Sequence, residues 1–254
     1  MSNRLDVALT ERGLAESRTR AVELIKCGLV SVSGTVVTKP SYAVETDTVI
    51  TVSADRVCPY VSRGGLKLAA ALDRFHLKVE GCVCADIGAS SGGFTDCLLK
   101  NGAARVYAVD SGAGQLHFSL RNDPRVISRE GCNARYLDET VLPEPVSLMV
   151  MDVSFISQTK LYAAVLPHLA VGGTLVTLIK PQFEVGRSGV GKGGLVRDEK
   201  KRREAVAFVC EAARIQGMVL RGVIPSPIRG GDGNAEFLAC FVKPKTETEG
   251  EIPL

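Results

Sequence analysis

The chain has 254 residues, of which 45% are hydrophobic and 23% are charged, and its formal net charge is +3. This length and composition fit a folded protein with one substantial core and a small appended domain, and they exclude a disordered or fibrous chain. No apolar run approaches the ~18 residues of a membrane span, and the N-terminus lacks the apolar stretch of a signal peptide. We therefore expect a soluble, cytoplasmic protein without a membrane partner, and a monomer.

The eight cysteines are scattered without a CxxC pair, and the chain has only three histidines. This spacing supports neither a metal site nor a disulfide framework, so we expect reduced thiols and no bound metal.

Residues 1–55 are expected to form the first unit. Apolar residues at helical spacing, Leu14 among them, predict a short helix near the N-terminus. A second helix is expected to begin after Ser17 and to end at Gly28. Two β-branched runs around Ser33-Gly34 predict a hairpin, and DTVITVS predicts a further strand.

Short basic motifs recur in this first unit: Arg4-Leu5-Asp6, Ser17-Arg18, Ile25-Lys26-Cys27-Gly28 and Lys39-Pro40. Charge alone fits solvated helix faces equally well. In order and spacing, however, the motifs resemble the S4 RNA-binding module. The resemblance implies that basic side chains, with one more from beyond the linker, contact RNA phosphates: Arg4, Arg18, Arg20, Lys26, Lys39 and Arg63.

Residues 56–61 are expected to be a linker, and residues 62–246 to be a second domain followed by a polar tail, 247–254. Helical and strand-like segments alternate over this domain, which predicts a Rossmann-like α/β fold with a mostly parallel seven-stranded sheet. The last two strands have no crossover helix between them. They are therefore expected to pair as an antiparallel hairpin at one edge of the sheet.

The stretch DIGASSGGFT follows the first strand of this domain, where doubly wound sheets bind ligands. Ser90 occupies the middle glycine position of the dinucleotide pattern, which weakens the case for NAD or FAD. The turn fits better the D-x-G-x-G-x-G pattern of enzymes that use S-adenosylmethionine (SAM). Asp110 would then bind the ribose hydroxyls and Asp86 the amino group. The predicted cofactor residues of the turn are Asp86, Gly88, Ser90, Gly92, Gly93 and Phe94.

A second glycine-rich stretch, from Gly186 to Gly193, resembles a phosphate-binding loop. Gly193 stands where that loop needs a hydroxyl for magnesium. A loop that covers a substrate is the better interpretation.

Two charged residues follow strands at the edge of the sheet that carries the glycine-rich turn. Asp152 lies at the carboxyl end of the strand in VSLMVMDV, and Lys180 ends TLVTLIK. The segment from Asp152 to Phe155 lacks the N/D-P-P-Y/F motif of amino methyltransferases. The sequence therefore argues against an enzyme that methylates an amine. Lys180 could be an ordinary surface lysine whose apolar stem packs on the protein while its charged end reaches solvent. It could also lie close to Lys67 and Glu236 at one site.

Eight motifs spread over residues 61–243 occur in a characteristic order: VSRGGLKL, DIGASSGGFTDCLL, VYAVDSGAGQL, LRNDPRV, MDVSFIS, LIKPQFEVG, VGKGGLVRD and GNAEFL. They resemble the TlyA (haemolysin-A-type) family of ribosomal RNA 2′-O-ribose methyltransferases, which are FtsJ-like and carry an S4 module. The resemblance implies SAM as cofactor, with Asp110, Asn133 and Asp152 among its contacts. It also implies ribosomal RNA or ribosomal subunits as partner, with cytidine as the target, and a catalytic set of Lys67, Asp152, Lys180 and Glu236.

These residue types suit the chemistry, because a ribose hydroxyl needs a base before it attacks a methyl group. Two lysines in one desolvated pocket disfavour each other's charged form, so a neutral Lys180 could serve as that base. Three alternatives remain: a catalytically silent ribosome-assembly factor, a membrane-acting haemolysin, and an oxidoreductase on the same architecture.

Overall fold

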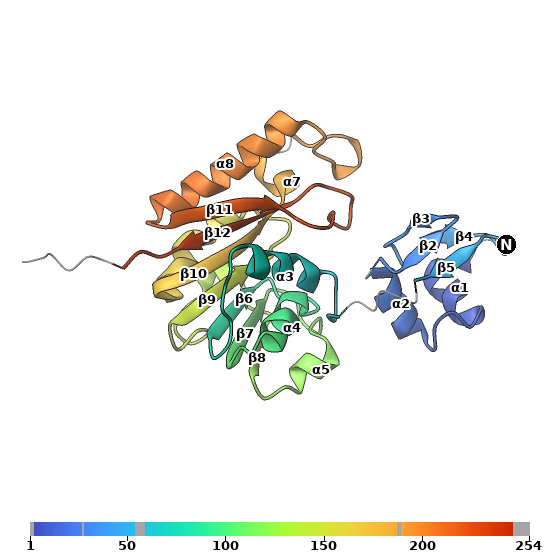
Figure 1. Ribbon diagram of the computed structural model, residues 1–254, viewed down its shortest axis with the longest axis horizontal. Helices are drawn as coiled ribbons and strands as arrows, with labels where there is room; N and C mark the ends of the chain where they lie inside the picture. Colours follow the sequence, from blue (N-terminus) through green and yellow to red (C-terminus); the bar gives the residue numbers. More distant parts are fainter. Residues whose placement is uncertain (1–2, 27, 54–58, 187–188, 246–254) are drawn as a thin grey trace, which may run out of the picture.

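The computed structural model describes residues 3–26, 28–53, 59–186 and 189–245, without the side chains of Glu23 and Lys26. A small N-terminal unit of short strands and two helices lies to one side of a larger α/β domain (Figure 1). Of the linker predicted over residues 56–61, residues 56–58 lie outside the described residues.

The N-terminal unit has two small antiparallel sheets, β3-β2-β5 and β1-β4, and two helices. Its elements are β1 (Asn3–Arg4), α1 (Leu5–Glu11), α2 (Arg18–Lys26), β2 (Val30–Val32), β3 (Thr35–Val36), β4 (Ala43–Val44) and β5 (Ile50–Val52). They enclose a separate apolar core that includes Leu5, Leu9, Ile25 and Val30. This unit therefore has the burial of an independent domain.

Local signals in this unit worked as predicted, with one exception. The Ser17 hydroxyl accepts a hydrogen bond from the Arg20 amide at 3.2 Å, and Gly28 ends α2 with a φ of +70°. Ser33 and Gly34 both have positive φ values, +48° and +79°, as a tight hairpin requires. The exception is Leu14, which lies beyond the end of α1 and is 37% exposed.

The larger domain has one seven-stranded sheet in the order β11-β12-β10-β9-β6-β7-β8. Its strands are β6 (Val83–Ile87), β7 (Arg105–Asp110), β8 (Val126–Glu130), β9 (Val146–Met151), β10 (Leu169–Ile179), β11 (Val219–Pro225) and β12 (Phe237–Val242). Five strands run parallel, and β12 pairs antiparallel with both β10 and β11. The predicted fold and the predicted edge hairpin are confirmed.

Helices cover both faces of this sheet (Figure 1). They are α3 (Gly64–Arg74), α4 (Gly93–Lys100), α5 (Phe118–Arg121), α6 (Tyr162–Val165), α7 (Pro181–Glu184) and α8 (Glu199–Ile215), with 3-10 turns at 134–136, 158–160, 166–168 and 192–194. Neighbouring residues of β6 face opposite cores: Cys84 packs with α3 and α4, whereas Ala85 packs with α6 and α8. This alternation is the period-two pattern of a sheet buried on both faces.

The carboxyl ends of β6, β7, β9 and β10 meet at one edge of the sheet, because these strands are parallel neighbours. The segments that follow them begin at Gly88, Ser111, Asp152 and Lys180. The fold thus gathers at one edge the residues that sequence reasoning singled out.

Candidate active site

The glycine-rich turn between β6 and α4 is held tightly against the ends of the neighbouring strands. The amides of Gly88 and Ala89 both donate to the Val109 carbonyl, at 2.8 and 3.1 Å. A Cβ on Gly88 would lie 2.5 Å from the Asp152 carbonyl oxygen, and its φ is +88°. Only glycine fits there. Ser90 adopts the left-handed region with a φ of +49°.

A pocket of about 320 Å³ opens beside this turn. We call it the glycine-turn pocket. Five of the predicted cofactor residues line it: Gly88, Ser90, Asp110, Asn133 and Asp152. Its volume lies within the range of small-molecule sites.

Asp110 is the last residue of β7, and its carboxylate organises the wall of this pocket. One oxygen accepts the Ser90 amide at 2.8 Å, and the other accepts the Gly112 amide at 2.7 Å. Each carboxylate oxygen has a further lone pair, so Asp110 can still accept hydroxyl hydrogen bonds from a ribose.

Glu130, which sequence reasoning missed, holds the segment that closes the same pocket. It ends β8 next to Asp110, and its carboxylate accepts the amides of Gln115 and Leu116 at 2.7 and 3.1 Å. Backbone N–H groups, with that of Leu116 contributing most, lower the pKa of Glu130. A charged Glu130 therefore fixes the position of Gln115 at the pocket wall.

Two predicted cofactor residues do not face either of the pockets at this edge. Asp86 is fully buried beneath the turn, where its Oδ2 accepts the Thr95 hydroxyl at 2.7 Å. Burial raises its pKa to about 7. Gly92 packs under the turn as well, because a Cβ there would lie 2.2 Å from Leu120 Cδ1. Both residues support the turn from below, and their part in binding the cofactor stays a prediction.

A second pocket of about 320 Å³ adjoins the first. We call it the lysine pocket. Lys67 and Lys180 line it, together with Arg63 and the predicted cofactor residues Gly93 and Phe94, which therefore belong to this pocket instead. Four residues line both pockets: Gly88, Ser90, Asp152 and Ser154. The two pockets thus meet at the end of β9.

The four residues of the predicted catalytic set form two short ion pairs. Lys180 Nζ lies 2.6 Å from Asp152 Oδ1, and Lys67 Nζ lies 2.6 Å from Glu236 Oε2. The Lys67–Glu236 pair is buried, with side chains 10% and 3% exposed. Each lysine therefore faces a carboxylate. The structure thus pairs each lysine with a carboxylate, whereas the prediction considered only the two lysines in one pocket.

Ser154 gives Lys180 a second contact that the sequence did not signal. Lys180 Nζ donates a hydrogen bond to Ser154 Oγ at 2.7 Å. With Asp152 on one side and Ser154 on the other, the amine is held at the junction of the two pockets. Its side chain is 12% exposed.

Phe155 is the most exposed large hydrophobic residue of the described chain, at 92%. It lines the glycine-turn pocket, and its φ is +63°, which is strained for an aromatic residue. Its ring lies 5.5 Å from that of Phe183, at an interplanar angle of 54°. Strain and exposure in one residue beside a pocket indicate a role in contacting a ligand.

The predicted RNA-contact residues fall into several environments. Arg4 and Arg18 both bind the buried carboxylate of Asp6, each at 2.9 Å. These contacts, led by the hydrogen bond from Arg4, lower the pKa of Asp6 to about 2. Both guanidinium groups thus share one carboxylate as their anchor, while 49% of the Arg4 side chain and 61% of the Arg18 side chain stay exposed.

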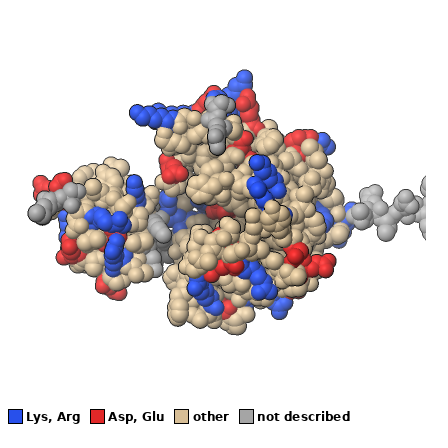
Figure 2. All heavy atoms as spheres, turned by 180° about the vertical axis from the view of Figure 1, so that it is seen from behind, with Lys and Arg blue, Asp and Glu red and all other residues tan. Residues whose placement is uncertain are grey.

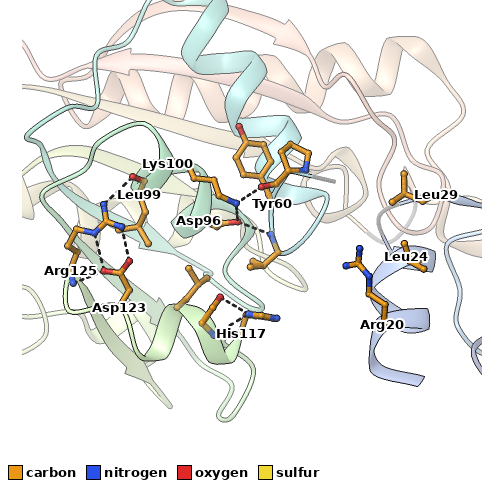
Figure 3. Close-up of a pocket in the computed structure, with 14 residues that line it drawn as sticks. Arg20, Leu24, Leu29, Tyr60, Asp96, Leu99, Lys100, His117, Asp123 and Arg125 are labelled. Carbon is orange, nitrogen blue, oxygen red and sulfur yellow. Dashed lines mark hydrogen bonds and ion pairs between the residues drawn. The ribbon is translucent and has the colours of Figure 1, made fainter. Parts of the chain in front are cut away.

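The other predicted RNA contacts are not part of this anchor. Lys39 is exposed, Arg63 lines the lysine pocket, and Arg20 lines a cavity of about 480 Å³ between the two domains (Figure 3). The side chain of Lys26 lies outside the described residues.

The inter-domain cavity is not where the charged strand ends converge. Its cations on the α/β side are already neutralised, since Lys100 pairs with Asp96 at 2.9 Å and Arg125 pairs with Asp123 at 2.7 Å (Figure 3). None of Lys67, Asp152, Lys180 and Glu236 lines it. The candidate site is therefore the pair of pockets at the strand ends.

Comparison with known proteins decides the family. Residues 60–243 match the FtsJ-like methyltransferase family, and residues 3–50 match the S4 domain. The "16S/23S rRNA (cytidine-2'-O)-methyltransferase TlyA" of Mycobacterium tuberculosis is 44% identical over 97% of this chain and 91% of its own length. The chain belongs to the TlyA family. It is a methyltransferase, and SAM is its cofactor.

Two further relatives of the TlyA family bear other names. "Hemolysin A" of Brachyspira hyodysenteriae is 42% identical over 94% of this chain and 99% of its own length. A solved structure, a putative hemolysin from Streptococcus thermophilus, has a TM-score of 0.76 at 41% identity, covering 97% of this chain and 91% of that one. The two-domain architecture is therefore shared along the whole chain.

Proposed function

We propose that this enzyme methylates the 2′-hydroxyl of a ribose, that of a cytidine, in ribosomal RNA, with Lys180 as the general base. The observation that carries the proposal is the position of Lys180 Nζ where the two pockets meet, 2.6 Å from Asp152 and 2.7 Å from Ser154. One pocket has the carboxylate and glycine turn that suit SAM, and the other has the cations that suit RNA. The methyl acceptor must lie between them.

As general base, Lys180 must meet the ribose hydroxyl as a neutral amine, because only a nitrogen with a free lone pair can accept the proton. When bound, SAM supplies a methyl group on a positively charged sulfur. A positive charge close to Asp152 competes with Lys180 for this carboxylate. Lys180 can then accept the hydroxyl proton at Nζ, while Ser154 and Asp152 keep the amine in place.

Lys67 and Glu236 would act on the sugar. Their ion pair is buried, and Lys67 lines the same pocket as Lys180. An ammonium held rigidly by Glu236 can donate a hydrogen bond to a ribose oxygen and fix its direction. Correct orientation of this kind is worth up to about 7–11 kcal/mol of a barrier.

The RNA would reach this site through both domains. The S4 domain offers Arg4 and Arg18 on their Asp6 anchor, and Arg63 lines the lysine pocket itself. Phe155 offers an exposed aromatic ring beside the pocket, on which a base can stack. The name of the Mycobacterium tuberculosis relative supports cytidine as the target. A ribosomal substrate would place the enzyme in the cytoplasm.

The three alternatives receive less support. A silent assembly factor needs no second pocket with two lysine–carboxylate pairs beside the cofactor turn. Ser90 at the middle glycine position still argues against a dinucleotide and hence against an oxidoreductase. The name of the relative "Hemolysin A" is the observation that favours the haemolysin alternative. Among the described residues, however, no helix is long and apolar enough to cross a bilayer.

The test is to incubate the enzyme with SAM carrying a labelled methyl group and with purified 30S or 50S bacterial subunits. Mapping of the labelled nucleotide by mass spectrometry should locate the mark on a ribose 2′-oxygen of a cytidine. The Lys180→Ala variant should still bind SAM and leave the RNA unmarked. A label on a base, or full activity of the variant, would refute the proposal.

A further inference from the structure

The start of α8 carries an unusual concentration of positive charge. Residues 192–204 contain six Lys or Arg and three Asp or Glu, so this segment has a net charge of +3, equal to that of the whole 254-residue chain. The rest of the chain is therefore balanced. Charge of this sign on one short segment is a local feature and needs a local explanation.

Two of the three acidic residues of the segment are engaged in holding the helix. Asp198 caps α8 by accepting the Lys200 amide at 2.8 Å. Glu199 pairs with Arg203 at 2.7 Å. In the part of the chain that the structure describes, no carboxylate forms a salt bridge with Lys192, Arg197, Lys200 or Lys201. We call these four residues the α8 cationic cluster.

The placement of the cluster does not serve the stability of the helix. Lys200 and Lys201 lie in the first turn of α8, where the helix dipole is positive and where cations are unfavourable. Lys192, Arg197 and Lys200 are exposed. A positive helix end surrounded by exposed, unpaired cations attracts an anion of extended shape.

The cluster lies at the same edge of the sheet as the active site. β10 ends at Ile179, and the chain then passes through Lys180 and α7 before α8 begins. The start of α8 accordingly lies at the carboxyl ends of the parallel strands, on the side of the α/β domain that faces the S4 domain (Figure 1). Seen from behind, Lys and Arg side chains project at the top of the α/β domain (Figure 2).

A buried asparagine fixes this segment to the loop that carries Glu236. Asn234, 2% exposed, accepts the Val196 amide and donates to the Gly194 carbonyl, both at 2.9 Å. Glu236 follows two residues later and pairs with Lys67. The hydrogen bonds of Asn234 thus connect the base of the cluster to the loop that carries Glu236, the partner of Lys67.

We propose that the α8 cationic cluster binds the phosphate backbone of the substrate RNA beside the target nucleotide. This inference rests on the proposed function, because it takes ribosomal RNA as the substrate. Lysine and arginine at a surface bind phosphates without reading sequence, and each contact releases counterions, which makes binding depend on salt. The cluster would set affinity and position, while the pockets carry out the reaction.

The experiment compares two double variants that remove the same charge. Lys200→Gln/Lys201→Gln changes the cluster and keeps good helix formers. The matched control, Arg74→Gln/Lys78→Gln, removes two exposed cations near the end of α3, which leads into the amino end of β6. Binding to purified 30S and 50S subunits and to protein-free ribosomal RNA is measured over a series of salt concentrations, with no methyl transfer required.

The slope of log affinity against log salt concentration should become shallower by about 1 to 2 in the cluster variant and should not change in the control, since each lost phosphate contact contributes about 0.7–0.9. The KM for RNA should rise and the single-turnover rate at saturating RNA should stay the same.

Equal slopes for wild type and cluster variant, or an equal loss in the control, would overturn the inference. So would a loss on subunits but not on protein-free RNA, which would indicate an acidic ribosomal protein as the partner. If the wild type binds RNA but methylates no ribose, the proposed function fails and the slopes still decide the role of the cluster.

Discussion

Asp86→Asn tests how the buried carboxyl beneath the glycine-rich turn affects the stability of the fold. Asp86 has no exposed surface, and burial raises its pKa from 3.8 to about 7. The folded state therefore holds the Asp86 proton more tightly than the unfolded state does. The group's stabilising contribution is complete below about pH 4, falls as the pH rises, and is lost once the pH passes about 7.

Each pH unit in this window is worth about 1.4 kcal/mol. Between about pH 5 and pH 7, the free energy of unfolding of the wild type should therefore fall by about 2 kcal/mol relative to that of Asp86→Asn, because the slope flattens as the pH nears the folded pKa. The side-chain amide cannot titrate, and it can still accept the Thr95 hydroxyl. Urea unfolding at a series of pH values, followed by circular dichroism, measures both free energies. A constant difference between the two proteins over this range would show that burial of Asp86 does not shift its proton equilibrium.

Three other changes probe separate parts of the site. Lys67→Met should lower the free energy of unfolding by about 3–5 kcal/mol, because Glu236 is left buried without a partner. Adding Glu236→Gln should restore most of this free energy in urea unfolding but should not restore the methylation rate. A double variant that is no more stable than Lys67→Met would contradict the pairing. Glu130→Gln should loosen the Gln115 segment and weaken SAM binding about tenfold, which is about 1.4 kcal/mol of binding free energy in calorimetric titration. An unchanged affinity would show that Glu130 does not help to form the SAM pocket. Phe155→Gly should raise the unfolding free energy by about 1 kcal/mol by relieving a positive φ, yet reduce kcat/KM for RNA; an unchanged kcat/KM would show that the ring contacts no substrate.

Much of the fold followed from patterns that depend on local physics. Alternating strands and helices fixed the parallel sheet, and the absence of a crossover before β12 predicted the edge hairpin. Ser17, Gly28 and Ser33-Gly34 marked element ends, because hydrogen-bond capping and positive φ restrict which residues fit. The prediction that the first helix includes Leu14 was wrong, because an apolar residue at helical spacing does not show where the helix ends.

The candidate site was predictable to the extent that it depends on strand ends. Asp110, Asp152 and Lys180 follow parallel strands, so their convergence is a property of topology. The pairing of each lysine with one carboxylate is not visible in sequence, because it depends on how α3 and the loop before β12 pack.

Burial and packing are the features of the site that motif spacing does not reveal. Asp86 and Gly92 match a cofactor motif by spacing, yet one is buried against Thr95 and the other packs on Leu120. The Ser154 contact arises from the course of the chain after β9 and has no signature of its own.

The role of Lys180 as base is tested most directly by single-turnover methylation with saturating SAM and ribosomal subunits. Lys180→Met removes the amine and keeps the length and apolar character of the stem. Its rate constant should fall about 10²- to 10⁴-fold, the usual contribution of a general base, while its affinity for SAM and for RNA stays close to that of the wild type. A variant that transfers the methyl group at the wild-type rate, with both affinities unchanged, would contradict the account.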